Sequence, residues 1–303
     1  MKTPAGFMVL SPGEKDAMRE AGRVVGRLLA FLRTITTVGV NTRELDEAAE
    51  AFILEQGARP AFKGIYGYKY TICASENEKV VHGIPNRRRL QEGDILGLDL
   101  GAVVDGIYAD AAITVPLGRI SDAAAELLRV TEESLWLGLT EARPGARVGD
   151  VGAVVQKHSE GHGFSVVREF VGHGIGDTLH LPPQVPNFGV HGDGGLLVKD
   201  MAIAIEPMIN AGTYQTRTLD DKWTVITADK RLSAHFEHTI LLGDKPEVLT
   251  WEQGRDYAEM AALGVDPVAM RPLGPGEVTA TIGQSQGVLE RERERTSNTS
   301  FRH

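Results

Sequence analysis

The sequence predicts an α+β protein made of two similar halves that pack face to face. Segments with apolar residues at helical spacing alternate with short apolar segments bounded by turn residues. The chain also repeats itself weakly at a shift of 106 residues, which places Gly39 on Gly145 and Asp94 on Asp200. A site at the seam between two such halves would take its residues from both.

Four helices are expected. The first opens at Ser11, because Pro12 fits the first turn of a helix and Glu14, three residues after the serine, completes a capping box. The second begins near Asn41 and stops at Gly57. The third and fourth are expected over residues 121–142 and from about 148 to 158.

Three apolar segments read as strands: residues 94–100, 201–206 and 235–242. The first is expected to turn at residues 104–106, so that a second strand carries Asp110 back beside Asp99. Glu206 closes the second segment, where Pro207 blocks continued pairing. Glu237 lies inside the third, where an inward carboxylate is costly unless it is paired.

Composition narrows the class of protein. The chain of 303 residues is 42% hydrophobic, and its formal net charge of −9 argues against coating nucleic acid or an anionic membrane. Cys73 is the single cysteine, which suits a reducing compartment. The N-terminal residues resemble no signal peptide, and no apolar run has the length of a transmembrane helix. We therefore expect a cytoplasmic protein.

The last fifty residues differ from the rest. From about Trp251 the apolar pattern fades, prolines recur and a polar GQSQG segment follows. We expect an N-terminal extension over residues 1–10, one domain over 11–251 and an appendage over 252–303 that is largely disordered towards its end.

Five side chains have the chemistry of a metal site. Taken singly, each has an ordinary interpretation, as a turn residue, a structural histidine or half of an ion pair. Together, four carboxylates and one imidazole match the charge of two divalent cations, and an oxygen-rich site with one imidazole suits Mn²⁺, Fe²⁺, Co²⁺ or Zn²⁺. The five candidates are Asp99, Asp110, His173, Glu206 and Glu237.

Six strings around these residues carry a family resemblance. They are VVHGIP (80–85), GLDLG (97–101), YAD (108–110), GHGIG…LH…PPQVPN (172–187), IEPM (205–208) and WTV…LSAHFEHT (223–239). Over roughly residues 8–250 the chain resembles the type I methionine aminopeptidases of the pita-bread metallopeptidase family. The resemblance implies a pita-bread fold, with two pseudo-symmetric α/β halves and a central antiparallel sheet flanked by helices.

The resemblance also implies a role for each candidate ligand. Asp99 would chelate one metal ion, and His173 and Glu206 would hold the other. Asp110 and Glu237 would bridge both ions. A hydroxide between the two ions would attack the first peptide bond, since two cations lower the pKa of bound water.

Two histidines gain a role only through the resemblance. Glu206 would accept the proton of the nucleophile, His180 would steady the tetrahedral centre, and His82 would contact the substrate backbone and assist proton movement. The expected methionine pocket departs from the family pattern at three positions. The family has Cys, Tyr and Phe where this chain has Phe62, Ile65 and Leu179. The expected substrate-binding residues are His82, His180, Tyr68, Cys73, Trp223, Phe62, Ile65 and Leu179.

The expected activity is removal of the initiator methionine from peptides and nascent chains with a small second residue. The resemblance implies a monomer that meets its substrates at the ribosome, without a nucleic-acid or membrane partner. One alternative is a proline-directed peptidase, although such enzymes usually carry an extra N-terminal domain. The others are a non-catalytic binding module and a metal-free amidinohydrolase on the same scaffold, both of which predict loss of ligands.

Overall fold

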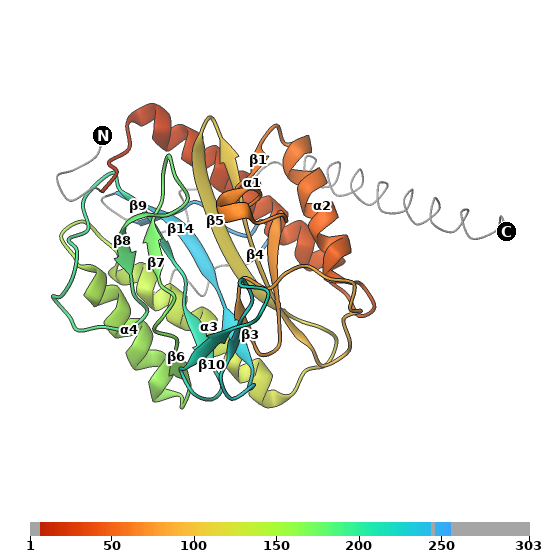
Figure 1. Cartoon of the computed structure of the whole chain (residues 1–303). Helices are drawn as coiled ribbons and strands as arrows, with labels where there is room; N and C mark the ends of the chain where they lie inside the picture. The colour runs from red at the N-terminus through yellow and green to blue at the C-terminus, as the bar shows by residue number, and fades with distance from the viewer. Residues whose placement is uncertain (1–6, 244–245, 256–303) are drawn as a thin grey trace.

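A computed structural model describes residues 7–243 and 246–255 of the chain. Its centre is a nine-stranded sheet in the order β1-β4-β5-β14-β9-β7-β8, with β2 paired to β4 and β15 paired to β14. Four helices flank this sheet, and every strand pair in it is antiparallel (Figure 1). The expected α+β class is confirmed.

The helices are α1 (Pro12–Ile35), α2 (Thr42–Glu55), α3 (Asp122–Glu141) and α4 (Val148–Gly161), with a short 3₁₀ turn at Ile65–Gly67. The main-sheet strands are β1 (Arg59–Pro60), β2 (Ile72–Glu76), β4 (Ile95–Val104), β5 (Ile107–Pro116), β7 (Gly172–Gly174), β8 (Leu181–Val185), β9 (Ala202–Ile205), β14 (Glu237–Leu242) and β15 (Pro246–Val248). A three-stranded sheet contains β6 (Ser165–Val166), β10 (Met208–Asn210) and β13 (Ser233–His235). A second three-stranded sheet contains β3 (Lys79–Val81), β11 (Thr216–Thr218) and β12 (Val225–Thr227).

The predicted helix starts are confirmed by their caps. Ser11 caps α1, its amide donating to Glu14 Oε2 at 2.7 Å while its own hydroxyl accepts from the Glu14 amide. Asn41 caps α2 in the same reciprocal way with Glu44. The fourth helix runs past the predicted end at His158 to Gly161, because Ser159 is buried and continues the packed face.

The internal repeat appears in the element boundaries. Helices α2 and α4 lie 106 residues apart at both ends, from 42 to 148 and from 55 to 161. Strands β1 and β6 keep the same spacing, from 59 to 165. In the main sheet, the pair β4-β5 of the first half lies beside the pair β14-β9 of the second. The two halves therefore meet where β5 pairs with β14.

The prediction of a single strand over residues 235–242 was wrong. The chain forms two strands there, β13 and β14, and they join different sheets on either side of Phe236. The neighbouring segment breaks at the same level, because Pro207 has no N–H to continue the pairing of β9. The Phe236 amide instead donates to the Pro207 carbonyl at 3.3 Å. The two segments therefore leave the main sheet together next to Glu206 and continue as the β10–β13 pair of a smaller sheet.

The main hydrophobic core lies between the sheet and the helices. One face of α1 contributes Val25, Leu28 and Leu32, which are buried against the strands. None of the described helices is both long enough and apolar enough to cross a bilayer.

The predicted domain limits stay predictions. Met8 and Leu10, in the expected extension, are buried, and at the other end Glu252 pairs with Arg33 of α1. The appendage predicted from 252 lies, apart from its first four residues, outside the described part of the chain.

Candidate active site

Five adjacent strands of the main sheet each supply one candidate ligand. Asp99 lies on β4, Asp110 on β5 and Glu237 on β14. Glu206 directly follows β9, and His173 is the middle residue of β7. Because these strands are neighbours in the order β4-β5-β14-β9-β7, the ligands form a row across the seam between the two halves.

The strand register turns the carboxylates to one face. Ala112 lies directly opposite Asp99 on one side and opposite Glu237 on the other. Residues that oppose each other in antiparallel strands share a face, and so do residues two apart in one strand. Asp110, two residues before Ala112, therefore points to the same face, and the predicted hairpin is confirmed.

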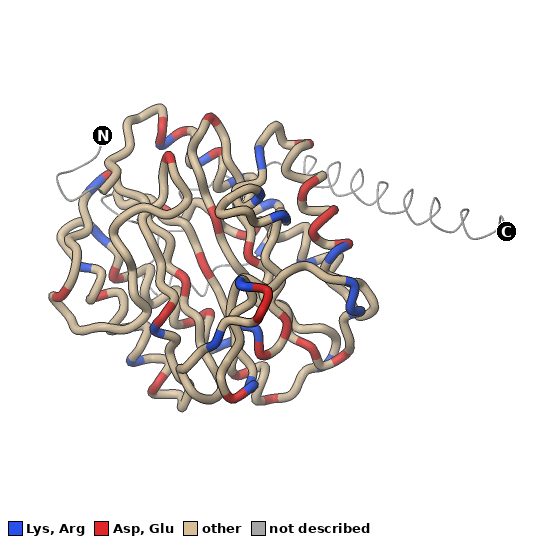
Figure 2. The backbone as a smooth tube through the Cα atoms, viewed as in Figure 1, with Lys and Arg blue, Asp and Glu red and all other residues tan. Residues whose placement is uncertain are grey.

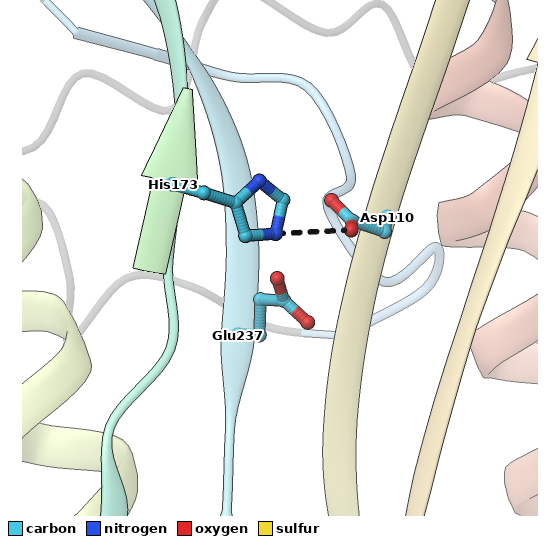
Figure 3. A group of neighbouring side chains, drawn as sticks. All are labelled: Asp110, His173 and Glu237. Atoms are coloured by element: carbon cyan, nitrogen blue, oxygen red, sulfur yellow. Dashed lines mark ion pairs between the residues drawn. The ribbon is translucent and has the colours of Figure 1, made fainter. Parts of the chain in front are cut away.

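His173 faces the carboxylates at short range. Its Nε2 lies 3.6 Å from Asp110 Oδ2 and 3.6 Å from Glu206 Oε1. Ligand atoms of Asp110, His173 and Glu237 all lie within 4.8 Å of one another (Figure 3). The other ring nitrogen, Nδ1, is 3.0 Å from the Gly174 carbonyl, to which it can donate. That bond favours the tautomer in which Nε2 is free to bind a metal.

Burial makes the carboxylates costly without cations. It raises the pKa of Asp99, Glu206 and Glu237 well above the usual range, and their mutual repulsion adds to the effect. It also raises the pKa of Asp110 to about 6 and lowers that of His173 to about 4. Divalent ions would relieve both penalties.

Two further observations bear on whether these residues fit a metal. Glu237 Oε1 is buried and has no hydrogen-bond partner among the described residues. The Thr239 hydroxyl lies 2.8 Å from the Asp110 carbonyl oxygen and 3.0 Å from Asp110 Oδ1, so its hydrogen is shared between these two acceptors and helps to orient that carboxylate. This support for Asp110 comes from the neighbouring strand β14. An oriented carboxylate and an unpartnered ligand atom fit a divalent metal site.

One cavity of about 230 Å³ brings all the predicted site residues together. Carboxylates and imidazoles line one part of it, and aromatic and aliphatic side chains line the rest. Sequence reasoning did not assign five further lining residues to the site, although they lie in or beside the quoted motifs. They are Tyr66, Val81, Phe170, Val171 and His235.

Specific contacts hold the side chains in the apolar part of the cavity. The Tyr68 hydroxyl donates to the Ile72 carbonyl at 2.8 Å, and its ring lies 4.9 Å from that of Trp223. Cys73 lies opposite Asp99 in the β2–β4 pair. Burial and that nearby carboxylate raise the pKa of the Cys73 thiol well above its usual value. The sulfur is therefore a neutral lining group, because the reactive form of cysteine is the thiolate.

His82 and His180 lie beside the part of the cavity that the candidate metal ligands line. The ring of His180 lies edge-on to that of His173, with 4.5 Å between centroids. His82 packs against Phe170 at 5.6 Å and holds a left-handed backbone conformation with φ of 58°. Burial lowers the pKa of both rings, that of His82 to about 4. Both are therefore neutral at pH 7 and can donate or accept a hydrogen bond.

The glycines around His173 allow backbone segments to approach closely. A Cβ on Gly172 would lie 2.3 Å from the Ala204 carbonyl oxygen, and one on Gly174 would lie 2.2 Å from that of Pro182. We expect Gly174→Ala to lower the free energy of unfolding by about 1–3 kcal/mol, because backbone must move. Denaturant unfolding measures the change in stability, and metal titration measures any change in metal binding.

Gly161→Ala is the matched control for that substitution. Gly161 is the last residue of α4, and a Cβ there meets nothing within 4 Å. The control should keep both stability and metal binding. Equal behaviour of the two variants would show that the close approach does not position His173.

Comparisons with known proteins agree with this geometry. The profile described as metallopeptidase family M24 matches residues 16–244. A methionine aminopeptidase of Clostridium perfringens is 48% identical over 245 residues, which cover 80% of this chain and 98% of that protein. The crystal structure of the methionine aminopeptidase from Thermotoga maritima superposes with a TM-score of 0.80 at 41% identity, covering 81% of this chain and 100% of that one.

A more distant likeness concerns the fold alone. The prolidase from Pyrococcus furiosus is 20% identical and superposes with a TM-score of 0.66, over 80% of this chain and 65% of that chain. Together with the Thermotoga structure, it confirms the expected pita-bread fold. The matched profile covers most of the chain and all five candidate ligands, and the chain therefore belongs to metallopeptidase family M24.

Proposed function

We propose that the chain is a metal-dependent aminopeptidase that removes the N-terminal methionine from peptides with a small second residue. One observation carries this proposal: a single cavity joins a cluster of buried carboxylates and imidazoles to an apolar end that contains sulfur and aromatic rings. Such an end suits a thioether side chain. The similarity to methionine aminopeptidases over 80% of the chain supports the same activity.

Two divalent ions are the cofactors that we propose, drawn from Co²⁺, Mn²⁺, Fe²⁺ or Zn²⁺. Asp99 would hold one ion and His173 with Glu206 the other, while Asp110 and Glu237 would contact both. The support is the row of ligands on one face of the sheet and the charge of four carboxylates. When bound, the ions would polarise the substrate carbonyl and lower the pKa of a water molecule.

The remaining steps fall to side chains of the chain itself. Glu206, at the metal end of the cavity, is proposed to accept a proton from the attacking water and to return it to the leaving amine. His180, edge-on to His173, would donate a hydrogen bond to the oxygen on which charge develops. His82 would orient the substrate backbone and assist proton movement. Tyr68, Cys73, Trp223, Phe62, Ile65 and Leu179 would enclose the methionine side chain.

A peptide assay tests the activity directly. Purified protein with Mn²⁺ or Co²⁺ is expected to release methionine from Met-Ala-Ser and to leave Leu-Ala-Ser and Ala-Pro-Pro intact, because the apolar part of the cavity matches an unbranched thioether. Release of amino acids is followed by chromatography. Met-Phe-Ser tests the requirement for a small second residue and should be cleaved poorly.

The same assay separates the alternatives. Equal cleavage of Met-Ala-Ser and Leu-Ala-Ser would contradict the proposed specificity for methionine. Preference for Ala-Pro-Pro would indicate a proline-directed peptidase. No cleavage of any peptide, together with no bound metal after dialysis, would favour a binding module. Asp110→Asn is the control for the metal measurement.

We place the reaction on nascent chains at the ribosome in the cytoplasm, carried out by a monomer. The single cysteine supports a reducing compartment, and the net charge of −9 does not favour nucleic acid or anionic membrane as a partner. Size-exclusion chromatography with light scattering tests the monomer, and a dimer would contradict it.

A further inference from the structure

His235 is a buried histidine of the cavity to which the proposed chemistry gives no role. Its side chain is 4% exposed, and Nε2 has no hydrogen-bond partner in the described part of the chain. The residue lines the same cavity as the five candidate ligands. A buried polar nitrogen without a partner is rare in folded proteins and calls for an explanation.

The backbone around His235 is fixed on two sides. On one side, the His235 amide donates to Thr114 Oγ1 at 2.9 Å, and the same hydroxyl donates back to the His235 carbonyl at 2.8 Å. On the other side, β13 pairs His235 with Met208 of β10. The ring is therefore held at the site by rigid strands and does not reach it through a mobile loop.

Strand alternation turns His235 towards the ligands. It lies two residues before Glu237, and residues two apart in an extended chain share a face. The intervening Phe236 joins the main hydrophobic core, and His238 packs against Trp136 with 5.2 Å between ring centroids. His235 is thus the member of this segment that accompanies Glu237 into the cavity.

The carboxylate of Glu206 lies between two imidazoles. Its Oε1 is 3.6 Å from His173 Nε2, and its Oε2 is 4.0 Å from His235 Nε2. The same nitrogen of His235 is also 4.0 Å from Glu237 Oε2. These gaps are longer than a hydrogen bond, but a small movement of one side chain closes either of them. Carboxylates that bind metals are commonly held by such outer hydrogen bonds.

We propose that His235 is a positioning residue: its Nε2–H donates to Oε2 of Glu206 and leaves Oε1, on the side of His173, turned to the metal. This inference rests on the proposed function, because Glu206 is there both a ligand and the proton acceptor. The 4.0 Å gap closes when Glu206 turns to the metal, and the bond then fixes the rotation of the carboxylate. His235 itself touches neither the metal nor the substrate.

Two substitutions test the role of the ring nitrogen. His235→Leu removes the donor, whereas His235→Gln keeps a side-chain N–H of similar reach. Calorimetric titration of the metal-free proteins with Mn²⁺ should show about 10–100-fold weaker binding for the leucine variant. The number of bound ions should be unchanged, and the glutamine variant should stay within about threefold of the wild type. With saturating Mn²⁺, the leucine variant should lower kcat on Met-Ala-Ser more than it changes KM.

Thermal unfolding of the metal-free forms separates positioning from a purely structural role. His235→Leu should unfold no earlier than the wild type, because it removes a buried group without a partner. His238→Leu is the matched control on the same segment: it loses the 3.0 Å bond to Thr250 Oγ1 and should lower stability without changing Mn²⁺ affinity.

Four outcomes would overturn the inference. They are unchanged Mn²⁺ affinity in His235→Leu, equal loss in the glutamine and leucine variants, a drop in the number of bound ions, which would make His235 a ligand, and early unfolding of metal-free His235→Leu. If the wild type itself binds no Mn²⁺, the proposed function fails together with this inference. If the wild type binds and cleaves but the leucine variant matches it, the inference fails alone.

Discussion

Glu206→Gln is expected to lower kcat on Met-Ala-Ser by at least about 100-fold, the lower end of the range for losing a general base. Glutamine keeps the size of the side chain, but it can neither accept a proton at neutral pH nor carry the negative charge of a ligand. Initial rates at saturating Mn²⁺, combined with metal analysis of the purified variant, measure the loss of rate and the loss of metal separately.

Asp177→Asn is the control for that experiment. Asp177 lies in the turn between His173 and His180, but its side chain is exposed and outside the cavity. The control should keep nearly full activity. A loss of less than tenfold in Glu206→Gln would show that another group accepts the proton.

Metal removal is expected to make the stability of the protein fall as pH rises above about 6.5, because the buried histidines, whose pKa is lowered by folding, are then neutral in the folded and the unfolded chain alike. The folded chain raises the pKa of Asp99, Glu206 and Glu237, so between pH 4 and these raised values it binds more protons than the unfolded chain does. The stability that these groups contribute in protonated form is therefore fully present below about pH 4 and is lost as pH increases.

Added metal should reverse this trend, because ions replace the protons on the same carboxylates. At a free Mn²⁺ concentration of 100 Kd, one ion stabilises the folded state by about 2.7 kcal/mol, which is roughly 5–10 °C in Tm for a domain of this size. The gain in Tm should be larger at pH 8 than at pH 6 and should disappear with EDTA. Differential scanning calorimetry measures all three effects.

Glu237→Gln gives the matched comparison. The substitution removes a buried negative charge, so the metal-free variant should be more stable at pH 8 than the metal-free wild type. It should also lose most of the Tm gain with Mn²⁺. A variant that is less stable without metal and still responds to it would contradict the view that Glu237 is costly until a cation binds.

Much of the fold was predictable because its signals are local. Ser11 with Glu14 marked the start of α1 within a few residues, and Asn41 marked α2. The turn at residues 104–106 marked the hairpin that brings Asp99 and Asp110 together. Each of these signals depends on neighbours within about a dozen residues of the chain.

The remainder depends on contacts between distant segments. The break at Phe236 arises because its pairing partner contains Pro207, almost thirty residues earlier, and no pattern within residues 235–242 reports it. In the sequence, His235 has the pattern of an ordinary strand residue. Its buried nitrogen without a partner and its position beside Glu206 follow only from the folded structure. The support for Asp110 from Thr239 also spans 129 residues. Charge and family motifs predicted the candidate ligands but could not show what orients them.

The row of ligands across the seam has a consequence for how the enzyme matures. Asp99 and Asp110 are made early, but Glu237 is near the end of the described domain, and its strand fills the place between β5 and β9. A chain still being synthesised holds only a fragment of the binding site until that last strand inserts. Metal capture at the proposed site would therefore require both halves to be complete and joined, and a truncated or half-folded copy would lack part of the proposed ligand set.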